Sequence, residues 1–134
     1  REKITALVEC RLAIIAPVKE AQRRAIAIMA MPQNLPRSGQ TAWRTADRIW
    51  RLAGDNASDF NHYTKRATLT AIYTATIAAF MADEDPEYAD SRAFLARRVE
   101  NVMQFEKYKG QAKARMENMP SLSRFIGRLR YPAR

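Results

Sequence analysis

One stretch, residues 49–66, decides how this chain can fold, because it ends one helix, turns and begins another. Gly54 can adopt the left-handed backbone conformation that ends a helix. Turn and helix N-cap residues follow it at Asp55, Asn56, Ser58 and Asp59, whose side chains bond nearby backbone N–H groups. We therefore expect two helices that are joined by this turn.

The second of these helices carries an unusual polar face. If it begins at Ser58 or Asp59, positions i, i+3, i+4 and i+7 are occupied by Asp59, His62, Tyr63 and Arg66. An acid, an imidazole, a phenol and a guanidinium on one stripe are not what a hydrophobic core needs. The face is therefore either a structural polar network or a recognition surface.

Hydrophobic periodicity predicts helices along most of the chain. The expected helices span residues 2–15, 18–31, 38 or 41 to 53, 59–82, 88 or 91 to 116, and a short segment within 121–130. Residues 31–36 contain two prolines and predict a loop, and the acids of 83–85 predict a solvated turn. Residues 71–81 are apolar nearly all round, which predicts a buried helix that either packs tightly or lines a ligand cavity. The fold class is therefore all-α, with about six helices.

The charge points to anionic partners. The net charge is +9, and residues 107–134 carry eight Lys or Arg against one acid. Within 121–130, an apolar stripe with arginines beside it is typical of a helix on an anionic membrane, although docking onto the chain's own domain is the alternative. This membrane-binding set comprises Leu122, Arg124, Phe125, Ile126, Arg128, Leu129 and Arg130. Because the charge does not lie on a DNA-recognition helix, no specific nucleic acid is expected.

Catalytic constellations are missing from the sequence. A single histidine excludes a multi-histidine zinc site, and neither a phosphate-binding glycine loop nor a nucleophile elbow is present. We therefore expect no enzyme activity, no metal and no cofactor. The lone Cys10 stands in an apolar run and is expected to be buried and inert. Residue 1 is Arg and enters directly into a helical pattern, so we expect a fragment of a longer protein.

The turn and the helix after it carry a family resemblance. The residues that carry it are Trp50-x-x-Ala53-Gly54-Asp55, Asp59-Phe60-Asn61, Tyr63-Thr64-Lys65-Arg66 and Tyr73. This order resembles the Coq-nine family of ubiquinone-biosynthesis accessory proteins, which are lipid-binding relatives of the TetR regulators. Arg23-Arg24-Ala25 and the Pro-x-Asn-x-Pro motif at 32–36 extend the resemblance, which covers residues from about 11 to 102. The family has Trp where this chain has His62.

The resemblance implies a TetR-like C-terminal ligand-binding domain without the N-terminal helix-turn-helix module. Residues 1–118 would form the helical lipid-binding domain, and residues 119–134 a basic amphipathic segment. A homodimer would bind an isoprenoid lipid or quinone intermediate and present it to the di-iron demethoxyubiquinone hydroxylase at an anionic membrane surface. The expected location is the cytoplasmic face of the bacterial inner membrane, with the mitochondrial matrix as the alternative. The alternative functions are the ligand-binding and dimerisation domain of a TetR-type regulator, and a structural dimerisation domain without ligand.

The resemblance and the helical pattern together predict two sets of residues. The hydroxylase-facing set carries over Asp47, Ile49, Asp59 and Tyr63, puts His62 at the family's Trp position, and is completed by Trp50 and Arg66. Replacing Trp by His removes a large apolar anchor, so we expect a weaker or pH-sensitive contact there. The lipid cavity is expected to be lined by Ile72, Thr76, Phe80 and Met29.

Overall fold

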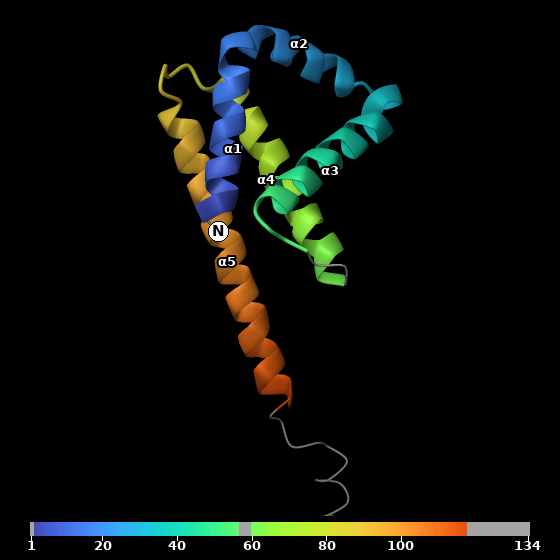
Figure 1. Cartoon of the computed structure of the whole chain (residues 1–134), viewed down its shortest axis with the longest axis vertical. Coiled ribbons are helices and arrows are strands. Elements are labelled where there is room, and N and C mark those ends of the chain that lie inside the picture. The colour runs from blue at the N-terminus through green and yellow to red at the C-terminus, as the bar shows by residue number, and fades with distance from the viewer. Residues whose placement is uncertain (1, 57–59, 118–134) are drawn as a thin grey trace, which may run out of the picture. The chain divides into compact units, whose positions relative to one another are not determined.

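The computed structural model describes residues 2–56 and 60–117. They form five α-helices and two 3-10 helices: α1 (Glu2–Ile15), η1 (Ala16–Val18), α2 (Lys19–Met29), η2 (Pro32–Asn34), α3 (Leu35–Leu52), α4 (Phe60–Ala82) and α5 (Ala89–Glu117) (Figure 1). The described residues contain no strand, which confirms the all-α class. The count of about six included a helix within 121–130, which lies outside the described residues. The TetR-like arrangement stays a prediction.

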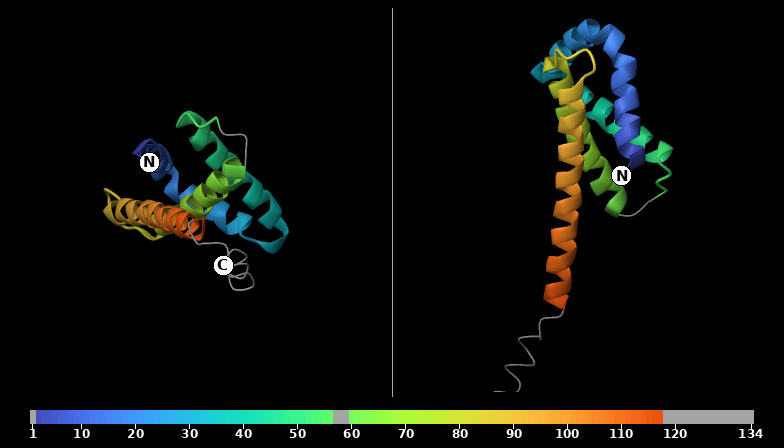
Figure 2. Two further views of the ribbon diagram at one scale, coloured as in Figure 1. Left: turned by 90° about the horizontal axis from the view of Figure 1, so that it is seen from below. Right: turned by 90° about the vertical axis from the view of Figure 1, so that its left-hand side faces the viewer.

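The chain divides into two compact units at Val99. The first unit, residues 1–99, contains α1 to α4 and the start of α5. Within it, α1, α3 and α4 pack together, as Figures 1 and 2 show. The second unit begins at Glu100, and its described part is the remainder of α5. The expected segment 119–134 lies outside the described residues, so that domain boundary stays a prediction.

The hydrophobic core belongs to the first unit. Helix α1 contributes one residue per turn, as its spacing predicted, and α4 contributes the most. Burying a large apolar side chain contributes about 1.5–3 kcal/mol each, so this cluster supplies the main stabilisation. The buried apolar residues are Ile4, Val8, Leu12, Ile15, Ala46, Ile49, Leu69, Tyr73, Ile77, Phe80, Met81 and Leu95.

Residues 31–36 do not form the loop that their prolines predicted. Pro32 begins η2, and Pro36 stands in the first turn of α3, which begins at Leu35 and not at Ser38 or Thr41. Proline is tolerated there because an N–H in the first turn has no helical acceptor. The Asn34 side-chain amide donates to the Ile28 carbonyl over 2.8 Å and fastens this connection to the end of α2.

The end of α3 follows the prediction for Gly54. Its φ is +92°, in the left-handed region. Gly54 N donates to Arg51 O over 3.0 Å, and Asp55 N donates to Trp50 O over 3.0 Å. This pair of bonds is the Schellman motif, which satisfies carbonyls at the helix end. The turn therefore directs the chain away from the axis of α3 immediately after Ala53.

Helix α4 is not buried all round, contrary to the prediction from its composition. Its core side carries Tyr73, Thr76 and Phe80, whereas Ala71, Thr74 and Ala78 are exposed. Small side chains add little apolar area to the surface, so a helix rich in Ala and Thr can keep one side open. None of the described helices is long and apolar enough to cross a membrane.

The turn between α4 and α5 also differs from its prediction. Asp83 is 7% exposed and not solvated. Its carboxylate accepts bonds from Ser91 N over 2.9 Å, from Ser91 Oγ over 2.6 Å and from Asp85 N over 3.0 Å. These hydrogen bonds, the one from Ser91 Oγ first, lower the pKa of Asp83. The acid therefore fixes the start of α5.

The first two helices are more exposed than the core helices. Cys10 is exposed on α1, so the prediction that it is buried is wrong. Helix α2 contains no buried residue. It is held instead by polar contacts, because Arg23 Nη2 donates to Met81 O over 2.5 Å and the Lys19 ammonium donates to Asp83 O. Cations at these carbonyls suit the negative end of the α4 dipole.

Candidate functional site

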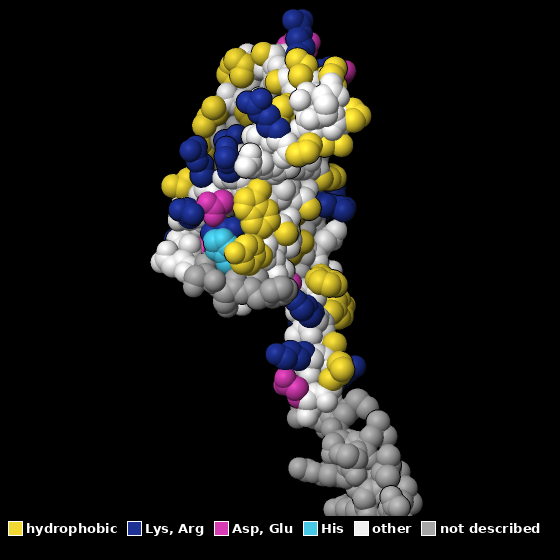
Figure 3. Space-filling view, turned by 90° about the vertical axis from the view of Figure 1, so that its right-hand side faces the viewer, with side chains coloured by type: hydrophobic (Ala, Val, Ile, Leu, Met, Phe, Trp, Pro, Cys, Tyr) yellow, Lys and Arg dark blue, Asp and Glu magenta, His cyan; other side chains and the backbone are white. Residues whose placement is uncertain are grey.

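Aromatic side chains from α3 and α4 gather on one surface of the first unit. The rings of Trp43 and Tyr63 stack with centroids 6.4 Å apart, and His62 meets Tyr63 edge to face at 5.1 Å. Tyr63 is 62% exposed. Figure 3 shows His62, the chain's one histidine, in cyan beside hydrophobic side chains. We call Trp43, His62 and Tyr63 the aromatic cluster.

An open, mostly apolar groove shares Trp43 with this cluster and runs along α4. Its volume is about 630 Å³. Its lining residues on α4 are small, so the groove leaves room for a partner's side chains. The residues that line it are Trp43, Ala67, Thr70, Ala71, Thr74, Ala75 and Ala78. The aromatic cluster and this groove share Trp43, and we call the two together the docking surface because a docking role is proposed for them below.

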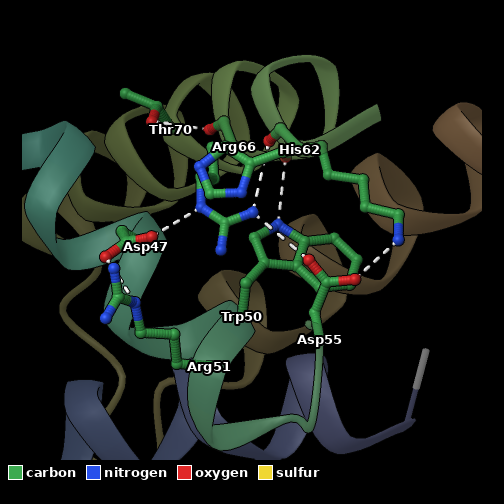
Figure 4. Close-up of polar contacts among 8 residues, drawn as sticks. Asp47, Trp50, Arg51, Asp55, His62, Arg66 and Thr70 are labelled. Carbon is green, nitrogen blue, oxygen red and sulfur yellow. Dashed lines mark hydrogen bonds and ion pairs between the residues drawn. The ribbon is translucent and has the colours of Figure 1, made fainter. Parts of the chain in front are cut away.

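A buried arginine ties α4 to α3 close to this surface. Arg66 is 1% exposed. Its Nε donates to Asp47 Oδ1 over 2.6 Å, and its Nη1 donates to Asp55 Oδ2 over 3.2 Å (Figure 4). Nη1 also lies 3.3 Å from the backbone oxygen of His62. One guanidinium thus joins α3, the turn and the first turns of α4.

The other carboxylate oxygens of Asp47 and Asp55 are paired as well. Arg51 Nε lies 2.9 Å from Asp47 Oδ2, and Lys65 Nζ lies 2.7 Å from Asp55 Oδ1. The Lys65 ammonium also stands 5.3 Å from the centre of the Trp50 ring. Trp50 Nε1 donates to the Lys65 carbonyl over 3.0 Å (Figure 4). Trp50 therefore joins α3 to α4.

Both carboxylates of the network stay charged at neutral pH. The hydrogen bond from Arg66 lowers the pKa of Asp47 below its ordinary value of 3.8. The hydrogen bond from Lys65 is the largest cause that lowers the pKa of Asp55 below the same value. Hydrogen bonds to the charged form favour that form, so the ion pairs persist over the physiological range.

The structure divides the polar face that the sequence predicted on α4. Tyr63 is exposed and His62 is half-buried. Arg66 points into the network instead. Its guanidinium is therefore not available to a partner, contrary to the prediction. Asp59 lies outside the described residues. The structural polar network is therefore present at Arg66, and the recognition surface stays a prediction for the exposed Tyr63.

The predicted partner residues on α3 lie mostly inward. Ile49 is 5% exposed and belongs to the core. The resemblance implied that it faces a partner, whereas its side chain does not reach the surface. Asp47 and Trp50 are half-buried and belong to the Arg66 network. These side chains support the docking surface and do not form its exposed part.

The three predicted cavity residues on α4 lie on a different side of this helix from the groove. Thr76 and Phe80 are 0% exposed and Ile72 packs against the core. The Phe80 ring contacts the Tyr88 ring with centroids 4.6 Å apart. Met29 is half-buried at the end of α2. The lipid cavity stays a prediction.

The predicted membrane-binding residues lie outside the described part of the chain. This set comprises Leu122, Arg124, Phe125, Ile126, Arg128, Leu129 and Arg130. Their amphipathic pattern remains an expectation from the sequence alone. Within the described residues, no group of three or more His, Cys, Asp or Glu is placed to hold a metal ion.

Sequence reasoning missed the groove. Ala67, Ala71, Thr74 and Ala78 follow the spacing i, i+4, i+7 and i+11, which is a single helical stripe. The signal was therefore present, but the large apolar residues interleaved with this stripe made the whole helix look buried. Trp43 is half-buried and lines the groove.

These features define the class of protein, an all-helical domain with an exposed aromatic cluster and an apolar groove on α3 and α4. Comparison with known families gives the particular family. Residues 35–106 match the COQ9 family model, and this range contains all of α3 and α4. The chain belongs to the COQ9 family, as its motifs indicated.

Curated relatives come from distant organisms. Human ubiquinone biosynthesis protein COQ9, mitochondrial, is 41% identical over 96 residues, which cover 72% of this chain and 30% of the human protein. The rat protein of the same name is 40% identical over 96 residues, covering 72% of this chain and 31% of the rat protein. A probable ubiquinone biosynthesis protein coq9, mitochondrial, of Dictyostelium discoideum is 30% identical over 109 residues, which cover 81% of this chain and 36% of the Dictyostelium protein. The chain thus spans about a third of the length of these relatives.

Proposed function

We propose that this chain serves ubiquinone biosynthesis as a non-enzymatic accessory that docks the di-iron demethoxyubiquinone hydroxylase through the docking surface of α3 and α4. The family supports this role, since its human and rat members are named ubiquinone biosynthesis proteins. The observation that carries it is the exposed aromatic cluster, with Tyr63 62% exposed, next to an apolar groove. Aromatic anchors beside apolar surface are typical of protein interfaces.

The Arg66 network supports the proposal by holding the docking surface in place. It fixes the first turns of α4 against α3 through bonds of 2.6 and 3.2 Å to Asp47 and Asp55. A surface that is ordered before binding loses less conformational entropy on association. The buried guanidinium therefore favours docking without touching the partner.

The proposed ligand is an isoprenoid lipid or quinone intermediate, which the protein presents to the hydroxylase at an anionic membrane surface. The ligand rests on the family resemblance. The net charge of +9 supports the membrane contact, for which residues 119–134 are the proposed segment. The relatives are named mitochondrial, so we propose the mitochondrial matrix, and the bacterial inner membrane gains no support from them. We also propose a homodimer.

Binding of the hydroxylase to two tyrosine variants tests the docking role. Tyr63→Ala removes an exposed aromatic from the cluster, and Tyr108→Ala removes one that is similarly exposed (69% against 62%) but stands in the second unit. A hot-spot residue contributes about 2 kcal/mol or more, so Tyr63→Ala is expected to weaken binding roughly 30-fold. Tyr108→Ala is expected to bind like the unchanged chain. Equal affinities of the two variants, measured by calorimetry, would refute the docking surface.

Solvent extraction and mass spectrometry test the ligand separately. Purified protein is expected to yield isoprenoid quinones or other long-chain lipids in near-stoichiometric amount. A lipid-free extract from protein that still binds the hydroxylase would contradict the carrier role and leave the docking role in place.

A further inference from the structure

A basic cavity lies between α1 and α3. Its volume is about 400 Å³, which is within the range of small-molecule sites. Helix α1 contributes one cation to it and α3 contributes two, one turn apart. The lining residues are Arg11, Thr41, Arg44, Thr45, Asp47 and Arg48. Two helices thus bring three guanidinium groups to one space.

The cavity's one acid does not neutralise these arginines. Asp47 Oδ1 accepts from Arg66 at 2.6 Å, and its Oδ2 is paired with Arg51 at 2.9 Å. Arg44 and Arg48 form no ion pair or hydrogen bond with any residue in the described part of the chain. Like charges repel one another, so an anion in this cavity would relieve an unfavourable interaction.

Arg11 is already held in position. Its Nε donates to the Tyr73 hydroxyl over 2.6 Å, and the guanidinium carbon lies 5.5 Å from the centre of the Tyr73 ring. Tyr73 is 8% exposed, so this support is fixed in the core. Both terminal nitrogens of Arg11 remain as donors. A pre-positioned guanidinium loses less conformational entropy when it binds a ligand.

The threonine hydroxyls do not compete as donors. Thr41 Oγ1 donates to Arg37 O over 2.8 Å, and Thr45 Oγ1 donates to Thr41 O over 3.1 Å. Their protons are therefore used within α3. Donation to a ligand in this cavity falls to the arginines.

We propose that this cavity binds a phosphate group through Arg11, Arg44 and Arg48. Guanidinium forks bind phosphate and carboxylate oxygens in pairs. Three forks from two helices match the several oxygens of a tetrahedral phosphate better than the two oxygens of a planar carboxylate. The headgroup of an anionic phospholipid and a soluble phosphate compound both present this chemistry. The site is separate from the groove and does not depend on docking of the hydroxylase.

The test compares two double variants of the full chain. Arg44→Gln with Arg48→Gln removes two charges from the cavity. Arg24→Gln with Arg97→Gln removes two charges from exposed positions elsewhere in the first unit. All four arginines are exposed, so neither change disturbs the core, and circular dichroism checks that both proteins stay helical.

In the first arm, inorganic phosphate and glycerol 3-phosphate are titrated into each protein. Binding is measured by calorimetry and by the shifts of the NMR signals of the arginine Nε–H groups. The second arm measures sedimentation with phosphatidylcholine vesicles, with and without phosphatidic acid. Residues 119–134 are unchanged in both variants, so their contribution to vesicle binding cancels in the comparison.

The expected result is binding that the cavity variant weakens about tenfold or more, because two charge-assisted contacts are lost, while the control variant stays close to the unchanged chain. Saturable binding in the first arm that the cavity variant weakens identifies a soluble phosphate compound. Binding in the vesicle arm alone that the cavity variant weakens identifies a lipid headgroup, and either result supports the site. Binding that neither variant weakens would overturn the proposal. Equal weakening in both variants would show a response to overall charge and overturn the proposal. Absence of binding in both arms, with unmoved arginine signals, would also overturn it.

Discussion

Arg66 donates its Nε to Asp47 Oδ1 over 2.6 Å, and the arginine side chain is only 2% exposed. The bond crosses from α4 to α3, between positions 19 residues apart in the sequence. A charge taken out of water in this way is stable only with partners, and Arg66 has Asp47, Asp55 and the His62 carbonyl. This contact makes the Arg66 end of the polar face of α4 part of the fold.

Removing this guanidinium is expected to cost far more stability than removing its exposed neighbour. Arg66→Leu leaves two partly buried carboxylates without their shared cation, so the free energy of unfolding is expected to fall by about 3 kcal/mol or more. Arg51→Leu removes a 70% exposed side chain from the same Asp47 and is expected to cost less than about 1 kcal/mol. Urea denaturation compares the two. Equal losses of unfolding free energy would show that the buried Arg66 contributes no more to stability than the exposed Arg51.

The stability of the first unit is expected to fall in acid. The pKa values of Asp47, Asp55 and Asp83 are lowered in the fold below the ordinary 3.8. A depressed carboxyl pKa stabilises the protein above the unfolded pKa, and this contribution is lost as the pH falls through the folded pKa. The melting temperature is therefore expected to be steady down to about pH 5 and to drop steeply below about pH 4. Asp47→Asn is expected to flatten this drop, and an unchanged slope would contradict the account.

The indole N–H of Trp50 gives a second comparison. Trp50→Phe removes the 3.0 Å bond to the Lys65 carbonyl and is expected to cost about 1 kcal/mol of unfolding free energy from that bond, in addition to lost packing. Trp43→Phe keeps an aromatic ring, and the Trp43 indole forms no hydrogen bond within the described residues, so its cost is expected to be smaller. Thermal denaturation ranks the two variants. A larger loss for Trp43→Phe would contradict the assigned roles.

A large side chain placed in the groove is expected to leave the fold stable but to weaken the complex with the hydroxylase. Ala71→Arg fills the groove and is expected to weaken hydroxylase binding about tenfold, while stability stays within about 0.5 kcal/mol, as for surface substitutions in general. Ala96→Arg places the same side chain at an exposed position on α5 and serves as the control. Binding that survives Ala71→Arg would exclude the groove from the interface.

Local patterns predicted much of this fold. Apolar spacing located α1, and Gly54 located the end of α3, because both depend on short-range backbone geometry. The start of α3 was missed, since proline breaks a helix interior but not its first turn, where Pro36 stands. Cys10 was misplaced, because an apolar run of sequence does not say which of its residues faces the core.

The candidate site was harder to predict, because helical spacing does not separate an exposed stripe from a buried one. Tyr63 and Arg66 share a stripe in the sequence, but Asp47 and Asp55 draw Arg66 inward and leave Tyr63 exposed. That outcome depends on residues from another helix and from the turn. The buried Asp83 was missed for the same reason, since its partner Ser91 lies beyond the turn that the acids predicted.

Hydrogen–deuterium exchange of the full chain, with and without the di-iron hydroxylase, tests the central claim most directly. The claim is that the docking surface on α3 and α4 contacts the partner. We expect slower amide exchange in α4 from about residue 61 to 78 and in α3 around Trp43 on binding, with α1 and α2 unchanged. Protection confined to α1 or α2, with none in α4, would contradict the account.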